Sequence, residues 1–138
     1  SEYNANEDKP VNLFQIWVFP NKQNLEPRYD QRRFDFSASK NQWLQIVGPD
    51  HDTSNEGLWI HQDAWFNIAS FDKGIEVEYR LKKSGNGIFA MVIDGEFLIG
   101  DQKLSKRDGL GIIDVDIIKV QSHTDGARIL LMEVPMSF

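Results

Sequence analysis

Hydrophobic and polar residues alternate with a period of two along much of the chain. In "IEVEYRL", Val77, Tyr79 and Leu81 fall on one side and the charged residues between them fall on the other, as in a strand with one buried face. No long segment shows the 3.6-residue period of an amphipathic helix. Further strands are predicted at 42–47, 58–69, 88–93, 96–99, 116–121 and 127–134. The pattern therefore predicts an all-β antiparallel sandwich or barrel.

Turn-forming residues separate these apolar segments. Asp94-Gly95, Gly100-Asp101 and Asp125-Gly126 each follow an apolar run, and glycine reaches positive φ without a clash at Cβ. We therefore expect two-residue hairpin turns at all three places. Longer loops are expected at 21–27 and 48–57, where turn-forming residues cluster.

Composition limits the classes of function. A chain of 138 residues is long enough to bury one core. Its 15 basic and 21 acidic residues give a net charge of −6, which argues against nucleic-acid binding. The absence of cysteine excludes disulfides, thiolate metal sites and cysteine nucleophiles. The acidic N-terminus does not resemble a secretory signal, and no apolar run is long enough to cross a bilayer, so we expect a cytoplasmic protein that does not contact membranes.

The three histidines do not suggest a metal site. His51, His61 and His123 are never two or four residues apart, so no pair can converge on one metal from a single element. In the predicted strand 58–69, His61 shares the parity of Trp59 and Trp65. It is either a ligand or base that lines a barrel, or a hydrogen-bonded strand histidine, and the second interpretation is the more ordinary one.

Four tryptophans, at positions 17, 43, 59 and 65, are many for a chain of this length. Aromatic side chains fill barrels, and they also stack on flat ligands. Core packing is the simpler interpretation. If the barrel binds a flavonol-like or sugar-like molecule, Trp43, Trp59, His61 and Trp65 are the residues expected to line its lumen.

Two other patterns have ordinary structural interpretations. The pairs Asp114/Asp116 and Glu76/Glu78 have the period of a strand, and we interpret each as a solvated strand face. The glycines in "SGNGIF" and "RDGLGIID" match no phosphate-binding loop and are interpreted as turn glycines.

Several motifs together resemble a known family. They are "NLFQIWVFP", "EPRYDQRRF", "IHQDAW", "VIDGEFLIGDQKLSKRDGLGIID" and "ILLMEVPM", in this order. The chain resembles, from about residue 11 onward, the second half of the pirin family of bicupins, in its bacterial quercetin 2,3-dioxygenase-like branch. The resemblance implies a cupin-type antiparallel β-barrel or jelly roll, the C-terminal cupin of a bicupin. It also implies a division into 1–36 (tail of the first cupin, junction strand and connector) and 37–138 (C-terminal barrel).

The resemblance implies a metal site outside this barrel. In the family, the first cupin holds one divalent, iron-like metal with three histidines and a glutamate, and supports dioxygenase activity on flavonols such as quercetin. Glu2 would be that glutamate, orphaned from its partners. Where the second cupin would present its own ligands, this chain has Lys82, Ser84 and Ile88. We therefore expect no metal, cofactor or catalytic residue here, and a non-catalytic scaffold for the missing N-terminal metal cupin of a parent dioxygenase.

The family resemblance also gives residues 12–20 a role. This apolar segment would be a junction strand against the first barrel. In the absence of that barrel we expect it to pair with a second copy, as a homodimer with Phe14 and Trp17 near the contact, or to fold back on its own barrel. Arg28, Arg32 and Arg33 would bind carboxylates across the junction. A small-ligand binding barrel and a protein-interaction module are the alternative functions.

Overall fold

The computed structural model describes residues 3–137, which contain ten strands and one short 3₁₀ helix. Glu2 lies outside the described residues. In chain order the elements are η1 (Phe36–Ser39), β1 (Leu44–Pro49), β2 (Leu58–Ile60), β3 (Trp65–Phe71), β4 (Glu76–Arg80), β5 (Asn86–Asp94), β6 (Phe97–Ile99), β7 (Gln102–Leu104), β8 (Gly109–Ile112), β9 (Ile117–Ser122) and β10 (Ala127–Pro135). The all-β prediction is confirmed. Within residues 3–137 no helix has the length and apolar character needed to cross a membrane.

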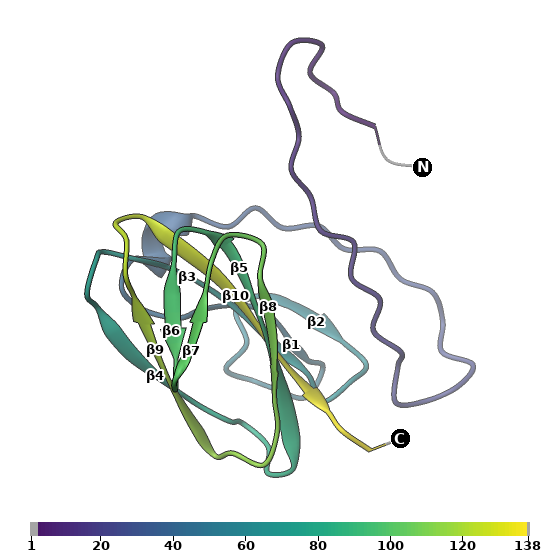
Figure 1. The fold of residues 1–138 in the computed structure, drawn as a ribbon. Helices are drawn as coiled ribbons and strands as arrows, with labels where there is room; N and C mark the ends of the chain where they lie inside the picture. Colours follow the sequence, from purple (N-terminus) through teal and green to yellow (C-terminus); the bar gives the residue numbers. More distant parts are fainter. Residues whose placement is uncertain (1–2, 138) are drawn as a thin grey trace.

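The strands form two facing sheets (Figure 1). The first has six strands in the order β2-β1-β3-β10-β5-β8, and the second has four in the order β4-β9-β6-β7. Strands β1 and β2 pair in parallel, whereas the other pairings are antiparallel. Along the chain, strands pass repeatedly from one sheet to the other, as in a jelly roll. All ten strands fall within 37–138; the division of the chain at residue 36 itself stays a prediction.

Only one of the three expected hairpin turns joins paired strands. Gly100-Asp101 connects β6 to β7, with Ile99 opposite Gln102. Asp94-Gly95 and Asp125-Gly126 instead carry the chain from one sheet to the other, from β5 to β6 and from β9 to β10. All three glycines do have positive φ, between 60° and 79°. The prediction of the reversals was correct, but a local reversal does not determine which strand lies alongside the next.

Two further strand predictions were wrong in detail. The predicted strand 58–69 is interrupted at residues 61–64, so that it forms β2 and β3 on opposite sides of β1. The parity that linked His61 to Trp65 is therefore lost. The glycines of "RDGLGIID" are not turn glycines, because Gly109 and Gly111 belong to strand β8. Asp114 and Asp116 are exposed, as expected, but they lie in the loop between β8 and β9 and not on a strand face.

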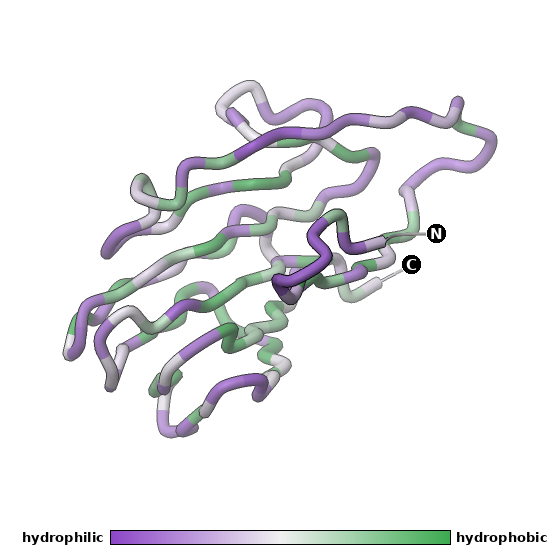
Figure 2. Tube along the Cα trace, turned by 90° about the horizontal axis from the view of Figure 1, so that it is seen from above, coloured by the Kyte–Doolittle hydropathy of each residue, from purple (hydrophilic) through white to green (hydrophobic). Residues whose placement is uncertain are grey.

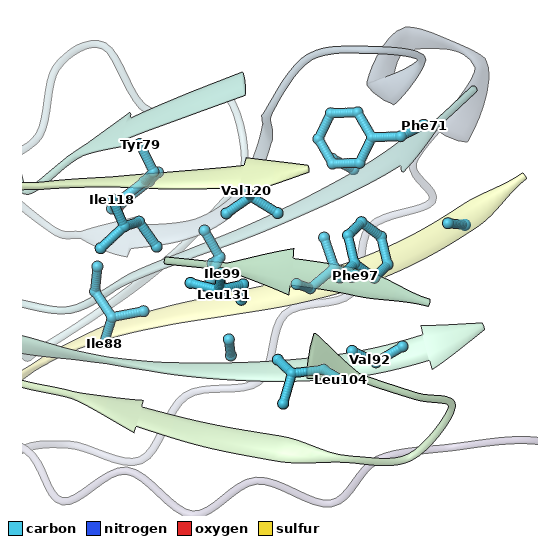
Figure 3. Close-up of a cluster of buried hydrophobic side chains, with 14 residues drawn as sticks. Phe71, Tyr79, Ile88, Val92, Phe97, Ile99, Leu104, Ile118, Val120 and Leu131 are labelled. Carbon is cyan, nitrogen blue, oxygen red and sulfur yellow. The ribbon is translucent and has the colours of Figure 1, made fainter. Parts of the chain in front are cut away.

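The main core lies between the two sheets (Figure 3). Alternate residues of β10, including Ile129 and Leu131, are fully buried and meet Val92, Phe97 and Val120 from β5, β6 and β9. Each such side chain contributes about 1.5–3 kcal/mol when it is fully buried. Figure 2 shows the same partition along the chain, with hydrophobic stretches following the strands and hydrophilic residues at the tips of turns.

A smaller apolar cluster covers the outer face of the six-stranded sheet. Phe66 and Leu130 are buried there, and Val18 packs on the cluster from the N-terminal segment. Residues 12–20 therefore fold back on the barrel, one of the two expected arrangements.

The predicted junction strand itself does not form, because residues 12–20 contain no strand. Single contacts hold the segment instead: Asn12 Oδ1 accepts from Arg107 (3.4 Å), and the Phe19 carbonyl accepts from Gln62 (2.9 Å). Its outward side chains stay exposed, Trp17 at 80% and Phe14 at 42%. The most N-terminal part of the chain projects away from both sheets (Figure 1).

Candidate functional site

A carboxylate is fully buried on the inner face of the six-stranded sheet. Glu133 lies on β10, at the parity of the core residues Ile129 and Leu131, and its exposed fraction is 0%. Opposite it on the neighbouring strand β3 stands Trp65. A charged group removed from water in this way requires hydrogen-bond partners.

Four groups donate hydrogen bonds to this carboxylate. They are the Tyr79 hydroxyl (2.8 Å), the Asn86 side-chain amide (2.9 Å), and the backbone N–H groups of Lys82 (2.9 and 3.1 Å) and Lys83 (3.0 Å). The two backbone groups come from the turn that connects β4 to β5, and Asn86 is the first residue of β5. The carboxylate of Glu133 therefore ties this turn to the strand β10.

The phenol of Tyr79 is also fixed by this network. Burial raises the pKa of Tyr79, and the negative charge of Glu133 raises it further. The hydroxyl consequently stays protonated and donates to Glu133, while it accepts from the buried Asn67 amide (3.3 Å).

The donor atoms of this centre do not suit a metal. A divalent ion needs several oxygen, nitrogen or sulfur ligands, but Glu133 is a single carboxylate whose oxygens already accept bonds from four groups. Across residues 3–137 no three His, Cys, Asp or Glu side chains are grouped so as to hold a metal ion. The geometry is that of a structural brace.

The residues expected in place of metal ligands lie in three different environments. Ile88 is 2% exposed and belongs to the main core. Ser84 lies in the exposed turn before β5. The side chain of Lys82 is exposed, and its backbone N–H donates to Glu133.

Of the four residues expected to line a lumen, the structure brings only two together. Trp59 and His61 lie edge to face, with 5.0 Å between ring centroids. Trp43 packs edge-on against Phe71 and Tyr79 at the border of the core. Trp65 is buried, and its indole N–H donates to Asp52 (3.0 Å). A small cavity of about 260 Å³ lies beside Trp43 and includes none of the other three.

The imidazole of His61 is held in place by the carboxylate of Asp50. Its Nδ1 lies 2.9 Å from Asp50 Oδ2, and His51 Nδ1 lies 3.4 Å from the other oxygen. Hydrogen bonding from His61 holds the pKa of Asp50 below its usual value. The interpretation of His61 as a hydrogen-bonded histidine is supported, although it follows β2 and is not within a strand.

Arg28 is bound within its own chain. Its guanidinium lies 3.6 Å from the centroid of the Trp59 ring, donates to the Trp59 carbonyl (2.7 Å) and pairs with Asp30 (3.1 Å). Within the described chain its carboxylate partner is Asp30 of the same connector, and a carboxylate across a junction stays a prediction. Arg32 and Arg33 are exposed and pair with no carboxylate in the described part of the chain.

Asp52 anchors the loop between β1 and β2. Burial alone would raise the pKa of Asp52, but hydrogen bonds from Ser54, Gln45 and Trp65 lower it to about 2. The loop that the sequence predicted at 48–57 is therefore fixed by an ionised carboxylate.

Glu133 is the residue that the sequence analysis missed. A signal was present: in "ILLMEVPM" one acidic residue has the same parity as Ile129 and Leu131. A charge on the apolar face of a strand indicates a buried and hydrogen-bonded carboxylate.

The fold and sequence match those of known proteins. The family model described as "Quercetinase C-terminal cupin domain" matches residues 45–134, well over half of the chain. The chain belongs to this family. This confirms the resemblance to the pirin bicupins and the cupin-type fold.

Individual proteins with this quercetinase-type domain are similar to the chain over most of its length. The quercetin 2,3-dioxygenase of Escherichia coli K12 is 30% identical over 135 residues, which are 98% of this chain and 55% of the relative. The crystal structure of YhhW from Escherichia coli superposes with a TM-score of 0.75 at 27% identity, covering 86% of this chain and 48% of that one. A second structure is described as bacterial pirin YhhW in complex with nickel(II), at 26% identity with the same score and coverage. The chain spans about half the length of the curated relatives that it matches.

Proposed function

We propose that this chain is the non-catalytic half of a quercetinase-type pirin, a metal-free barrel that supports a metal-bearing cupin domain. The observation that carries the proposal is the buried carboxylate of Glu133, which accepts hydrogen bonds from Tyr79, Asn86 and two backbone amides. Such a carboxylate provides stability without offering a vacant ligand position.

The partner in this proposal is a cupin domain that docks on the N-terminal segment. Relatives named quercetin 2,3-dioxygenase are about twice as long as this chain, so their remaining length is sufficient for a second domain. Leu13, Ile16, Trp17 and Phe19 expose 41–80% of their surface, and a row of large apolar side chains of this kind is typical of an interface. Arg32 and Arg33 provide a positive flank that suits carboxylates on the partner.

A turnover assay tests the proposal. The purified chain is incubated aerobically with quercetin after loading with Fe²⁺ or Ni²⁺, and loss of quercetin is followed by absorbance. We expect no loss above that of a heat-denatured sample with the same metal. The Escherichia coli relative, assayed in parallel, shows that the conditions support catalysis. Quercetin loss that increases with the concentration of this chain and requires metal would overturn the proposal.

A further inference from the structure

The core opens to solvent at one side of the sandwich. A cavity of about 450 Å³ lies between β8, the start of β9 and the turn that joins β6 to β7. Six aliphatic side chains form its floor and walls: Ile99, Leu110, Ile112, Val115, Ile117 and Ile118.

The opening follows from the topology of the sheets. Strand β8 is the last strand of the six-stranded sheet and β7 is the last of the four-stranded sheet, and no backbone pairing joins them. The core residues Ile99 and Ile118 form the floor and are only 4% and 6% exposed. Leu110 and Val115 pack against this core but remain half-buried. Apolar surface is thus left in contact with water at this site.

The lining defines the chemistry of a fitting ligand. The walls of the cavity are aliphatic. Its polar lining residues are exposed and lie at the rim: Asp101, Gln102 and Lys119. The Lys119 ammonium already lies 3.8 Å from Glu76. No side chain inside could replace the water around a sugar hydroxyl or an isolated charge, and burial of such groups would be costly. A neutral, mainly apolar molecule meets no such penalty.

Size also favours a small molecule over a peptide strand. The cavity volume is within the range of about 300–1,000 Å³ that is typical of small-molecule sites. The two free strand edges beside it, β7 and β8, are only three and four residues long. A peptide that added to either edge would find few backbone partners, and edge addition depends on them.

We propose that this cavity binds a neutral, mainly apolar small molecule, with its apolar part against Leu110, Ile112 and Val115 and any polar groups at the rim. The site is distinct from the lumen of Trp43, Trp59, His61 and Trp65 that the sequence suggested. It does not depend on the scaffold function, because ligand binding here involves neither a metal nor a partner domain.

Titration of the ¹⁵N-labelled chain with unsubstituted flavone tests the site by NMR. We expect saturable shift changes that are concentrated on the backbone amides of residues 99–102 and 110–118, and no changes with glucose. Two variants act on the cavity itself: Val115→Trp fills it, and Val115→Asp places a charge in it. Each should weaken flavone binding by about tenfold or more, equivalent to about 1.4 kcal/mol.

Val77→Asp is the matched control. Val77 is also a half-buried valine at the border of the core, but it lies on β4, at the opposite edge of the four-stranded sheet. This variant should bind flavone like the native chain. The NMR spectrum of each variant shows whether it is folded. If Val115→Asp does not fold, Val115→Trp alone tests the site. An absence of saturable shifts, shifts confined to residues 12–20, or undiminished binding by Val115→Trp would each overturn the proposal. None of these outcomes bears on the turnover assay.

Discussion

The buried carboxylate of Glu133 unites three parts of the chain at the scale of single residues. It lies on β10, accepts the Tyr79 hydroxyl from β4, and holds the turn before β5 through two backbone amides and Asn86. The bonds from the Tyr79 hydroxyl and the Asn86 amide are buried, and those from the two backbone amides are partly buried. The network therefore matters most when its acceptor is lost, since an unsatisfied buried donor costs about 1–3 kcal/mol.

Glu133→Ala should reduce the free energy of unfolding by about 3 kcal/mol or more, because four donating groups lose their acceptor. Glu133→Gln should reduce it by less, since one oxygen still accepts while the new NH₂ group faces other donors. Urea denaturation measures both. Glu76→Ala, on the exposed face of β4, should change stability by no more than about 0.5 kcal/mol. A Glu133→Ala protein as stable as this control would contradict the role of the network.

Asp52 predicts a pH dependence of stability. The pKa of Asp52 in the folded chain is about 2, below the 3.8 of an aspartate in an unfolded chain. Its contribution is therefore complete above pH 3.8 and is lost as the pH falls toward 2. Asp52→Asn should lower the thermal midpoint at pH 6 and flatten its decline between about pH 4 and pH 2. Asp116→Asn, in an exposed loop, controls for the lost charge; an equal flattening there would refute the assignment.

At the scale of elements, residues 12–20 show why an apolar pattern alone does not predict a strand. The segment has the composition of a strand, but pairing with a neighbouring edge decides whether a strand forms. Here it lies across the outer face of the six-stranded sheet, where only Val18 is half-buried. Its remaining apolar side chains are available to a partner.

A second copy can occupy this surface when the proposed partner domain is absent. We expect the purified chain to dimerise as its concentration rises, with Phe14 and Trp17 at the contact, because burial of these side chains is favourable. Trp17→Glu should keep the chain monomeric, whereas Tyr29→Glu, at an equally exposed aromatic position in the connector, should not. Light scattering after gel filtration distinguishes the states. A native chain that stays monomeric at high concentration would exclude the dimer.

The strands themselves were largely predictable, and their partners were not. Period-two alternation located β4 closely, because one face of this strand lies against the core. Strand β10 was located by its apolar run, since both of its faces are covered. The β8 strand was missed because Gly109 and Gly111 occupy its outward positions, where no side chain reports the alternation. Among the site residues, the inward position of Tyr79 was predictable from parity. Its partner Glu133 is distant in sequence, and no local pattern reveals such a contact.

For the whole molecule, we propose that the barrel holds no metal of its own, because within residues 3–137 no three His, Cys, Asp or Glu side chains are grouped to hold one. The fold class and family followed from the sequence because strand pattern and motifs extend along nearly the entire chain. Whether the barrel can bind a metal depends on a few side chains that the two sheets bring together. The structure shows that one of them, Glu133, already accepts hydrogen bonds from four groups.

Metal content is the most direct test of this claim. The chain is loaded separately with Fe²⁺, Ni²⁺ and Zn²⁺, passed through gel filtration in metal-free buffer and analysed by mass spectrometry for metal per chain. We predict well below one equivalent of each metal, and the same result for Glu133→Gln. One equivalent that the native chain retains, and that Glu133→Gln loses, would contradict the account.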